Sequence, residues 1–162
     1  MAAARRGASI ARMALVPAPY AAQFPQLAAL AQRGIARSLN AGDLLLREGD
    51  HGDALYLLIS GRMKVFGRSG PEGRELLYGH CEPGDYVGEM GLDGGPRVAS
   101  VQALEACEVV SVNREGVLDY LREDPAFALA LLGKVMRRIR STQSALKSIQ
   151  ASGSQPASAA QA

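Results

Sequence analysis

Residues 88–101 read GEMGLDGGPRVASV, a segment that we call the cassette. Its glycines allow the backbone to approach a ligand closely or to take positive φ angles. A helical turn at residues 90–92 would point free N–H groups at an anion. Arg97 can hold the same anion through two parallel hydrogen bonds, whereas the carboxylate of Glu89 suits a neighbouring hydroxyl. The cassette therefore predicts a ligand that carries one phosphate and one sugar hydroxyl.

Short strands surround the cassette. From Ala41 to Val112 the chain alternates apolar runs with Gly, Asp and Pro. Residues 54–60 are nearly all apolar, as in a strand buried on both faces, and residues 62–65 alternate, as in a strand with one face in solvent. Turns are predicted at 69–73, which would close a hairpin, and at 82–85. Strands at this spacing favour an antiparallel roll or barrel.

Helices are predicted on both sides of the strands. Residues 25–34 can form a short helix with an apolar stripe, and Asn113 can cap a second helix over 114–122. Asp124 followed by Pro125 starts a third, which runs to about Gln150. The stripe of the short helix consists of Leu27, Leu30 and Ala31.

The third helix carries apolar residues at heptad spacing, interrupted by one threonine. This seam could pair two copies of the chain, which we favour, or it could pack on the roll. Fewer than three heptads leave both interpretations open. The seam consists of Leu132, Val135, Ile139, Thr142, Leu146 and Ile149.

The cassette resembles the phosphate-binding cassette of cyclic-nucleotide-binding domains of the Crp/Fnr family, at Val87–Leu92 and Pro96–Val101. The strands and turns before it are similar too, so that the resemblance covers about residues 35–145. It implies a mainly β fold with flanking helices. The expected form is an antiparallel β-roll (double-stranded β-helix or jelly roll), followed by a long C-terminal helix that pairs two subunits in that family.

The resemblance and the composition together predict three segments. Residues 1–19 are expected to be disordered, and residues 20–150 to form the cyclic-nucleotide-binding domain, with the dimer helix at about 125–150. Residues 151–162, rich in Ser, Gln and Ala, are expected to be a disordered tail.

The resemblance also implies roles for single residues. Arg97 would neutralise the cyclic phosphate, Glu89 would bind the ribose 2′-hydroxyl, and backbone N–H groups near Gly91, Leu92 and Ala99 would complete the phosphate cradle. The full set of expected ligand-binding residues is Gly88, Glu89, Met90, Gly91, Leu92, Arg97, Val98, Ala99 and Thr142.

Two positions bear on the base of the nucleotide. Val98 follows the arginine, where relatives that prefer guanine often carry Ser or Thr, and it has no hydrogen-bond donor. Thr142 lies in an Arg-Arg-Ile-Arg-Ser-Thr segment that is similar to the base-contacting segment of the family's dimer helix. Cyclic AMP is therefore the expected ligand, ahead of cyclic GMP, although Thr142 could equally be a tolerated seam residue.

The composition argues against several functional classes. No apolar run reaches the roughly 18 residues that a membrane helix needs, and we expect no membrane association. Cupin enzymes, which share a similar roll, usually bind their metal through a His-x-His pair. This chain has only His51 and His80, so we expect neither a metal nor enzymatic activity. Cys81 and Cys107 form no close pair, as in a reduced cytoplasmic protein.

Charge is distributed unevenly along the chain. Residues 43–124 contain sixteen acidic and eight basic residues, a net charge of −8, whereas both flanks contain basic residues only. The basic flanks could dock on the acidic body or keep the protein in solution, which we favour. They could also contact nucleic acid or an acidic partner.

We therefore predict a sensor that switches between two states. Without ligand, Arg97 would be a partly buried charge that lacks its partner, and the ligand would relieve that cost and draw the last helix over the base. The 12 residues after Gln150 hold no helix-turn-helix, so we expect no direct DNA binding and an unknown downstream protein. Two alternatives stay open: a truncated Crp/Fnr-type transcription regulator, and a ligand-free β-roll that serves as an interaction module.

Overall fold

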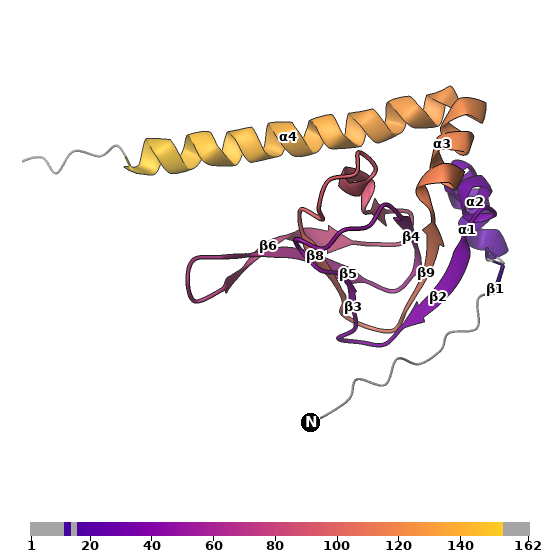
Figure 1. Cartoon of the computed structure of the whole chain (residues 1–162), viewed down its shortest axis with the longest axis horizontal. Coiled ribbons are helices and arrows are strands. Elements are labelled where there is room, and N and C mark those ends of the chain that lie inside the picture. Colours follow the sequence, from indigo (N-terminus) through magenta and orange to yellow (C-terminus); the bar gives the residue numbers. More distant parts are fainter. Residues whose placement is uncertain (1–11, 14–15, 154–162) are drawn as a thin grey trace, which may run out of the picture. The chain divides into compact units, whose positions relative to one another are not determined.

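The computed structural model of the 162-residue chain describes residues 12–13 and 16–153 (Figure 1). The chain divides into two compact units between Glu123 and Asp124, and each unit is described by itself. Among the described residues, the strands belong to the first unit, and the second unit consists of one long helix.

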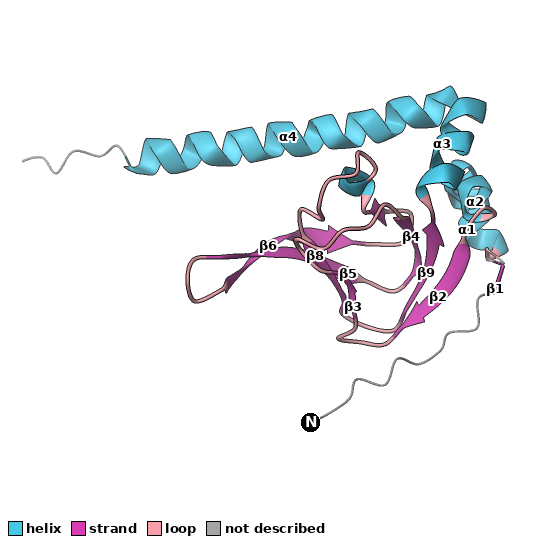
Figure 2. Cartoon of the chain, in the orientation of Figure 1, coloured by secondary structure: helices cyan, strands magenta, loops and turns pink. Residues whose placement is uncertain are grey.

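The strands of the first unit form two antiparallel sheets (Figure 2). One sheet has five strands in the order β1-β2-β9-β4-β7, and the other has four in the order β3-β8-β5-β6. The first sheet consists of β1 (Arg12–Met13), β2 (Ile35–Leu39), β9 (Cys107–Val112), β4 (Leu55–Ser60) and β7 (Tyr86–Val87). The second consists of β3 (Leu44–Leu46), β8 (Ser100–Ala103), β5 (Met63–Ser69) and β6 (Arg74–Cys81).

The hydrophobic core lies between the two sheets, because both supply side chains to it. Leu58 of β4 and Val109 of β9 come from the first sheet, and Met63 of β5 and Val101 of β8 come from the second; all four are fully or almost fully buried. Cys81 and Cys107 are buried members of the same core, and burial raises the pKa of the Cys107 thiol. The predicted antiparallel β-roll is therefore confirmed.

The turns between strands lie where the sequence predicts them. Strands β5 and β6 form a hairpin in which Ser69 faces Arg74, and residues 70–73 close it. At the second turn the side chain of Asp85 accepts a hydrogen bond of 2.9 Å from the N–H of Glu82. Gly84 takes φ 95° there, which only glycine adopts readily. A Cβ at Gly84 would also overlap the ring of Phe24, so this turn packs against the N-terminal helices.

Three α-helices and one 3₁₀ turn complete the described part of the first unit: α1 (Ala18–Gln23), α2 (Pro25–Ala31), η1 (Glu89–Gly91) and α3 (Arg114–Glu123). Leu27, Leu30 and Ala31 are buried, which confirms the predicted stripe of α2. The side chain of Asn113 accepts a hydrogen bond of 2.8 Å from the N–H of Gly116, as expected for the cap of α3.

The N-terminal segment is more ordered than the sequence predicts. Strand β1 pairs with β2, with Arg12 opposite Ala36, and α1 begins at Ala18, so the prediction that residues 1–19 are disordered is wrong at these positions. Proline at the start of each helix favours α1 and α2, because its fixed φ suits the first helical turn. Residues 1–11 and 14–15 lie outside the described residues.

The second unit contains α4 (Pro125–Gly153). The side chain of Asp124 accepts a hydrogen bond of 3.2 Å from the N–H of Phe127, which confirms the predicted helix start. The helix is three residues longer than predicted, because Ala151 and Ser152 do not break it and the Ser152 hydroxyl donates back to the Ser148 carbonyl at 2.9 Å. The expected disordered tail thus cannot begin at 151, and residues 154–162 lie outside the described part.

The apolar seam of α4 is largely exposed. Leu132, Ile139, Leu146 and Ile149 are between 51% and 68% exposed. Pairing of two chains through this seam stays a prediction. In the described residues, α4 and the other helices are too short or too polar to cross a membrane.

Candidate functional site

The first half of the cassette forms the predicted helical turn, one residue earlier than expected. The turn η1 spans Glu89–Gly91, and Gly88, which precedes it, takes φ 94°. That left-handed conformation is costly for any residue except glycine, so Gly88 is what allows β7 to turn directly into η1. Gly94, with φ 88°, ends the following turn.

The N–H groups of the turn are used differently from the prediction. The N–H of Gly91 donates to the Gly88 carbonyl at 3.0 Å, and that of Leu92 donates to the Glu89 carbonyl at 3.1 Å. A 3₁₀ turn engages these two groups in its own hydrogen bonds. The predicted contact of these N–H groups with a phosphate stays a prediction.

Arg97 is buried, with only 6% of its surface exposed. Its Nη1 donates to the carbonyl oxygen of Gly88, and its Nη2 to that of Ala54, both at 3.0 Å. The expectation that the charge of Arg97 lacks an anionic partner without ligand stays a prediction. Its fork is held by two neutral carbonyl oxygens, one in the cassette and one at the beginning of β4.

Three glycines enclose the guanidinium of Arg97. A Cβ at Gly91 would lie 2.7 Å from Nη1, a Cβ at Gly88 2.9 Å from Nη1, and a Cβ at Gly52 3.1 Å from Nη2. The two shortest distances are ones that real Cβ atoms essentially never show, so the backbone approaches Arg97 more closely than any side chain would allow. The absence of side chains at these glycines creates the space for the charged group.

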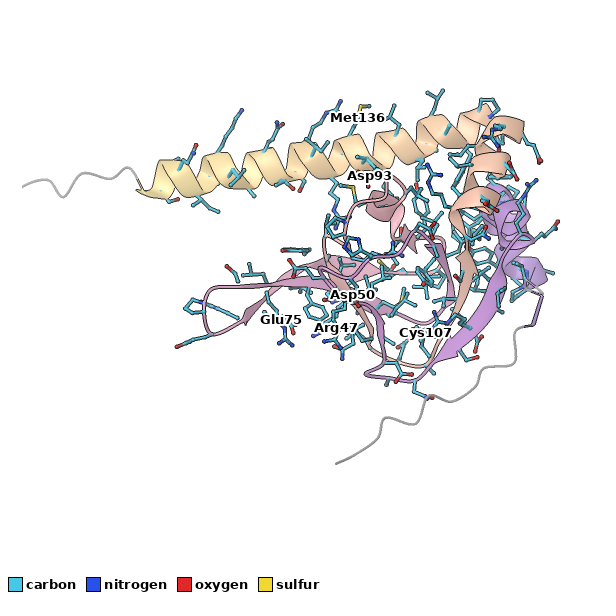
Figure 3. All side chains as sticks on the ribbon, viewed as in Figure 1. Arg47, Asp50, Glu75, Asp93, Cys107 and Met136 are labelled. Carbon is cyan, nitrogen blue, oxygen red and sulfur yellow. The ribbon has the colours of Figure 1, made fainter. Side chains whose placement is uncertain are left out.

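The backbone of Arg97 is fixed by the turn that ends β3. Its N–H donates to the Asp50 carbonyl at 2.8 Å, and its carbonyl accepts from the Gly49 N–H at 2.8 Å. One step further, the Ser100 hydroxyl accepts a bond of 2.9 Å from the N–H of Glu48. The site arginine thus belongs to a short, strand-like pairing between residues 48–50 and 97–100; Arg47 and Asp50 are labelled in Figure 3.

An aromatic ring lies beside the guanidinium. The centre of the Tyr56 ring is 5.9 Å from the Arg97 guanidinium carbon and 6.0 Å from that of Arg37 on β2. Cation–π attraction operates within about 6 Å, so Tyr56 lies at the limit of that range from both charges. Sequence reasoning missed Gly52, Ala54, Tyr56 and Arg37, because these contacts join positions more than 40 residues from Arg97, and only the strand pairing brings them together.

The other predicted cassette residues differ in burial. Glu89 is buried, at 7% exposure, and so is Ala99 at 6%, whereas Met90 and Leu92 are half-buried. Val98 is 46% exposed. Glu89 and Arg97 therefore lie at the two ends of the cassette as buried charged residues, and Val98 is directed to the surface.

The loop between the two halves is compact. The side chain of Asp93 accepts a bond of 2.8 Å from the N–H of Gly95, a local turn that glycine accommodates. At its start, the Leu92 carbonyl accepts a bond of 3.0 Å from Nε of Arg114, the first residue of α3. Asp93 is labelled on this loop in Figure 3.

Thr142 belongs to the second unit, on α4. It is exposed, and its hydroxyl donates to the carbonyl of Arg138, one turn earlier, at 3.0 Å. Its predicted contact with the base stays a prediction.

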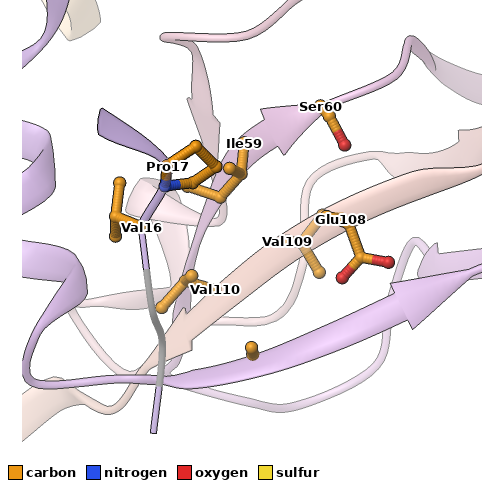
Figure 4. Close-up of a pocket in the computed structure, with 8 residues that line it drawn as sticks. Val16, Pro17, Ile59, Ser60, Glu108, Val109 and Val110 are labelled. Carbon is orange, nitrogen blue, oxygen red and sulfur yellow. The ribbon is translucent and has the colours of Figure 1, made fainter. Parts of the chain in front are cut away.

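A hollow lies on the five-stranded sheet, and none of its lining residues belongs to the cassette (Figure 4). Apolar side chains from the N-terminal segment, β2, β4 and β9 line most of it, and Ser60 and Glu108 supply its polar atoms. The carboxylate of Glu108 repels the negative charge of a phosphate, so this hollow does not suit the predicted ligand. Within residues 12–13 and 16–153, no three His, Cys, Asp or Glu side chains gather as a metal would require.

Known proteins share both the sequence pattern and the fold of this chain. The family model described as "Cyclic nucleotide-binding domain" matches residues 36–124, which include the whole cassette. The chain is 36% identical over 106 residues to the CRP-like cAMP-activated global transcriptional regulator of Mycobacterium tuberculosis, a match that covers 65% of this chain and 47% of that protein. The chain spans about half the length of the curated relatives that it matches.

Solved structures show the same fold. The catabolite activator protein of Thermus thermophilus is similar with a TM-score of 0.71 at 31% identity, covering 78% of this chain and 59% of that one. The regulatory domain of Toxoplasma gondii PKA, crystallised with cAMP, is similar with a TM-score of 0.53 at 28% identity, covering 59% of this chain and 36% of that one.

Proposed function

Because the chain belongs to the family of cyclic nucleotide-binding domains, we propose that it binds cyclic AMP at the cassette and changes conformation on binding. The observation that carries this proposal is Arg97, a buried arginine enclosed by glycines at the position where the cassette pattern puts the phosphate. We expect it to act as a regulatory sensor in the cytoplasm rather than as an enzyme.

The phosphate replaces the carbonyl partners of Arg97. A guanidinium has five N–H donors, and a charged phosphate oxygen is a stronger acceptor than a neutral carbonyl. The fork is already buried and directed into the cassette through its bonds to Gly88 and Ala54, so little ordering of this side chain is required. The N–H of Ala99, two residues after Arg97, is the proposed backbone donor.

The sugar and base are recognised by different residues. Glu89, the buried first residue of η1, accepts a hydrogen bond from the ribose 2′-hydroxyl. Val98 is exposed and offers no donor to a guanine base, which favours adenine. The relative from Mycobacterium tuberculosis is named as cAMP-activated, and the Toxoplasma gondii domain was crystallised with cAMP, in agreement with this choice. Thr142 is the proposed contact to the base.

Binding exchanges two sets of hydrogen bonds. In this structure Arg97 joins the carbonyl oxygen of Gly88 to that of Ala54. When the fork turns to the phosphate, these carbonyls lose it and the cassette rearranges. The ligand can shift the equilibrium between the two cassette conformations only by the difference in its affinity for them. A small difference in affinity is sufficient where the two conformations have similar free energies.

Two further proposals concern the assembly. The exposed seam of α4 pairs two copies of the chain, since a heptad stripe that is more than half exposed gains most from a second helix. The dimer then transmits the signal to a downstream protein, whose identity the chain does not specify. Direct binding of DNA by the described residues is not part of the proposal.

A second candidate is a ligand-free interaction module. The two carbonyl bonds of Arg97 favour it, because they satisfy the fork without any ligand. A roll with a satisfied cassette could serve as a scaffold only.

A calorimetric titration of the purified chain with cyclic AMP distinguishes the cyclic-AMP sensor from the ligand-free interaction module. Saturable binding with a dissociation constant below about 100 μM, equivalent to about −5.5 kcal/mol, is expected. Cyclic GMP and cyclic di-GMP are titrated in parallel and are expected to bind more weakly. Absence of saturation by all three would favour the scaffold, and equal binding of cyclic GMP would overturn the assignment of adenine.

A further inference from the structure

A hydrogen bond joins the cassette to helix α3. Nε of Arg114 donates to the carbonyl oxygen of Leu92 at 3.0 Å, across 22 residues of sequence. Leu92 is the C-cap residue that directly follows η1, and Arg114 is the first residue of α3. The bond therefore connects the end of one element directly to the beginning of the other.

The position of Arg114 is unfavourable for the helix itself. The N-terminus of a helix carries a partial positive charge, which repels a cation in the first turn. Asn113 already caps α3 through the N–H of Gly116, and Glu115 supplies the favourable charge. Arg114 thus adds nothing to the capping of α3, and its Nε donates to the cassette instead.

Helix α3 is held firmly at its other end. Glu123 forms an ion pair with Arg33, which follows α2, and the same guanidinium lies 5.5 Å from the centre of the Tyr120 ring. Val117 is fully buried and Tyr120 is 6% exposed. Its packed middle and its paired last turn make α3 a single rigid element, so that a change at its first residue, Arg114, bears on the whole helix.

The sequence places α3 on the covalent path between the two units. It ends at Glu123 and α4 begins at Pro125, so that only Asp124 separates them. A displacement of α3 is consequently passed to the residue that caps α4.

We propose that Arg114 is a positioning residue that couples the cassette to α3. Its bond to Leu92 fixes the end of η1 relative to the first turn of α3, so that a rearrangement of the cassette and a displacement of α3 occur together. The coupling is reciprocal: whatever restrains α3 also restrains η1. The part of this inference that concerns ligand-driven movement rests on the proposed function, whereas the part that concerns the ligand-free cassette does not.

The ligand-free part is tested by amide hydrogen exchange on three variants. Arg114→Leu removes the donor, Arg114→Lys keeps a cation that can donate, and Arg122→Leu is the matched control on the same helix, where the arginine pairs with Asp119. Arg114→Leu is expected to accelerate exchange in residues 89–94 by about threefold or more, through easier local opening. Arg114→Lys is expected to restore at least part of the protection. Unchanged exchange in Arg114→Leu, or equal acceleration in Arg122→Leu, would overturn the proposal.

The ligand-dependent part uses the same variants with saturating cyclic AMP. In the unchanged chain, the nucleotide is expected to alter exchange in residues 114–123, and Arg114→Leu is expected to lose most of this response while its affinity changes by no more than about fivefold. A full response in Arg114→Leu would overturn the coupling. If the unchanged chain binds no cyclic nucleotide, the proposed function fails, and the ligand-free experiment still decides whether Arg114 holds the cassette.

Discussion

The cassette and helix α4 are built in opposite ways. The cassette depends on partners distant in sequence: Arg97 bonds Ala54, 43 residues earlier, and its backbone pairs with residues 49–50. Hydrogen bonds of α4 such as those of Thr142, Ser148 and Ser152 join residues four apart, and its apolar seam is mostly exposed. The cassette is thus completed within one chain, whereas α4 has a completed backbone and an uncovered face.

The roll and α4 therefore differ in what their apolar side chains contribute to the free energy of unfolding. A side chain in the roll stabilises the fold through burial that already exists in one chain. A seam residue of α4 contributes little until something covers it, because exposed apolar surface gains nothing from folding. Substitutions in the two regions should therefore have effects of different size and different dependence on protein concentration.

The largest effect is expected from Leu58→Ala in the roll. Leu58 is fully buried in the core, so its truncation should lower the free energy of unfolding by about 2–5 kcal/mol, as for other buried leucines. Leu129→Ala is the control on α4, where the side chain is 71% exposed and does not belong to the seam, and should cost less than about 0.5 kcal/mol. Urea unfolding followed by circular dichroism measures both. Equal losses would mean that the two regions do not differ as described.

Arg97→Ala should produce the next largest effect, on ligand binding. Loss of the fork should raise the dissociation constant for cyclic AMP by about 100-fold, which corresponds to about 2.7 kcal/mol. Arg47→Ala, an exposed arginine whose backbone belongs to the adjoining turn, is the matched control and should bind within about threefold of the unchanged chain. Calorimetric titration gives both constants, and unaltered binding by Arg97→Ala would remove Arg97 from the site.

Leu146→Lys tests whether the seam of α4 is covered by a second copy. A buried charge at the centre of a helix pair is unfavourable, so the dimer dissociation constant should rise by about tenfold or more. Ser144→Lys adds the same charge two residues earlier and outside the seam, and it should leave the dimer intact. Sedimentation at several protein concentrations measures the mass. A dimer that is unaffected by Leu146→Lys would assign pairing to another surface.

The smallest expected effect is a loss of stability of the first unit at alkaline pH. Burial and the nearby charge of Asp85 raise the pKa of Tyr20 to about 12, and its hydroxyl is buried without a hydrogen-bond partner in the described structure. The folded chain therefore holds this proton more tightly than the unfolded chain, and stability should fall as the pH rises from about 10 through 12.

Tyr20→Phe should remove this loss and should raise the stability at neutral pH by up to about 1 kcal/mol, because an unsatisfied hydroxyl disappears. Residues 124–162 contain no tyrosine, so α4 has no phenol that could contribute to this loss. Circular dichroism against pH measures both forms. A steeper alkaline loss in Tyr20→Phe would contradict the assignment.

Patterns within a few residues carried most of the correct predictions. The buried stripe of α2, the caps at Asn113 and Asp124, and the turn at 82–85 are each encoded by neighbours, and each was confirmed. The same reasoning failed at Ser152, because a helix end without a breaker depends on a balance of small propensities. It also failed at Ala18, since the first helix begins where the disordered segment was expected to continue.

The amino-acid sequence by itself determined the antiparallel roll, the long last helix and the family, because alternation, caps and a run of glycines ending in Pro-Arg are local properties of the chain. Only the tertiary structure decided what Arg97 bonds, which N–H groups η1 uses for itself, and that Arg114 reaches Leu92. Those contacts follow from the register of strands that lie far apart in sequence, and no short-range pattern specifies such a register.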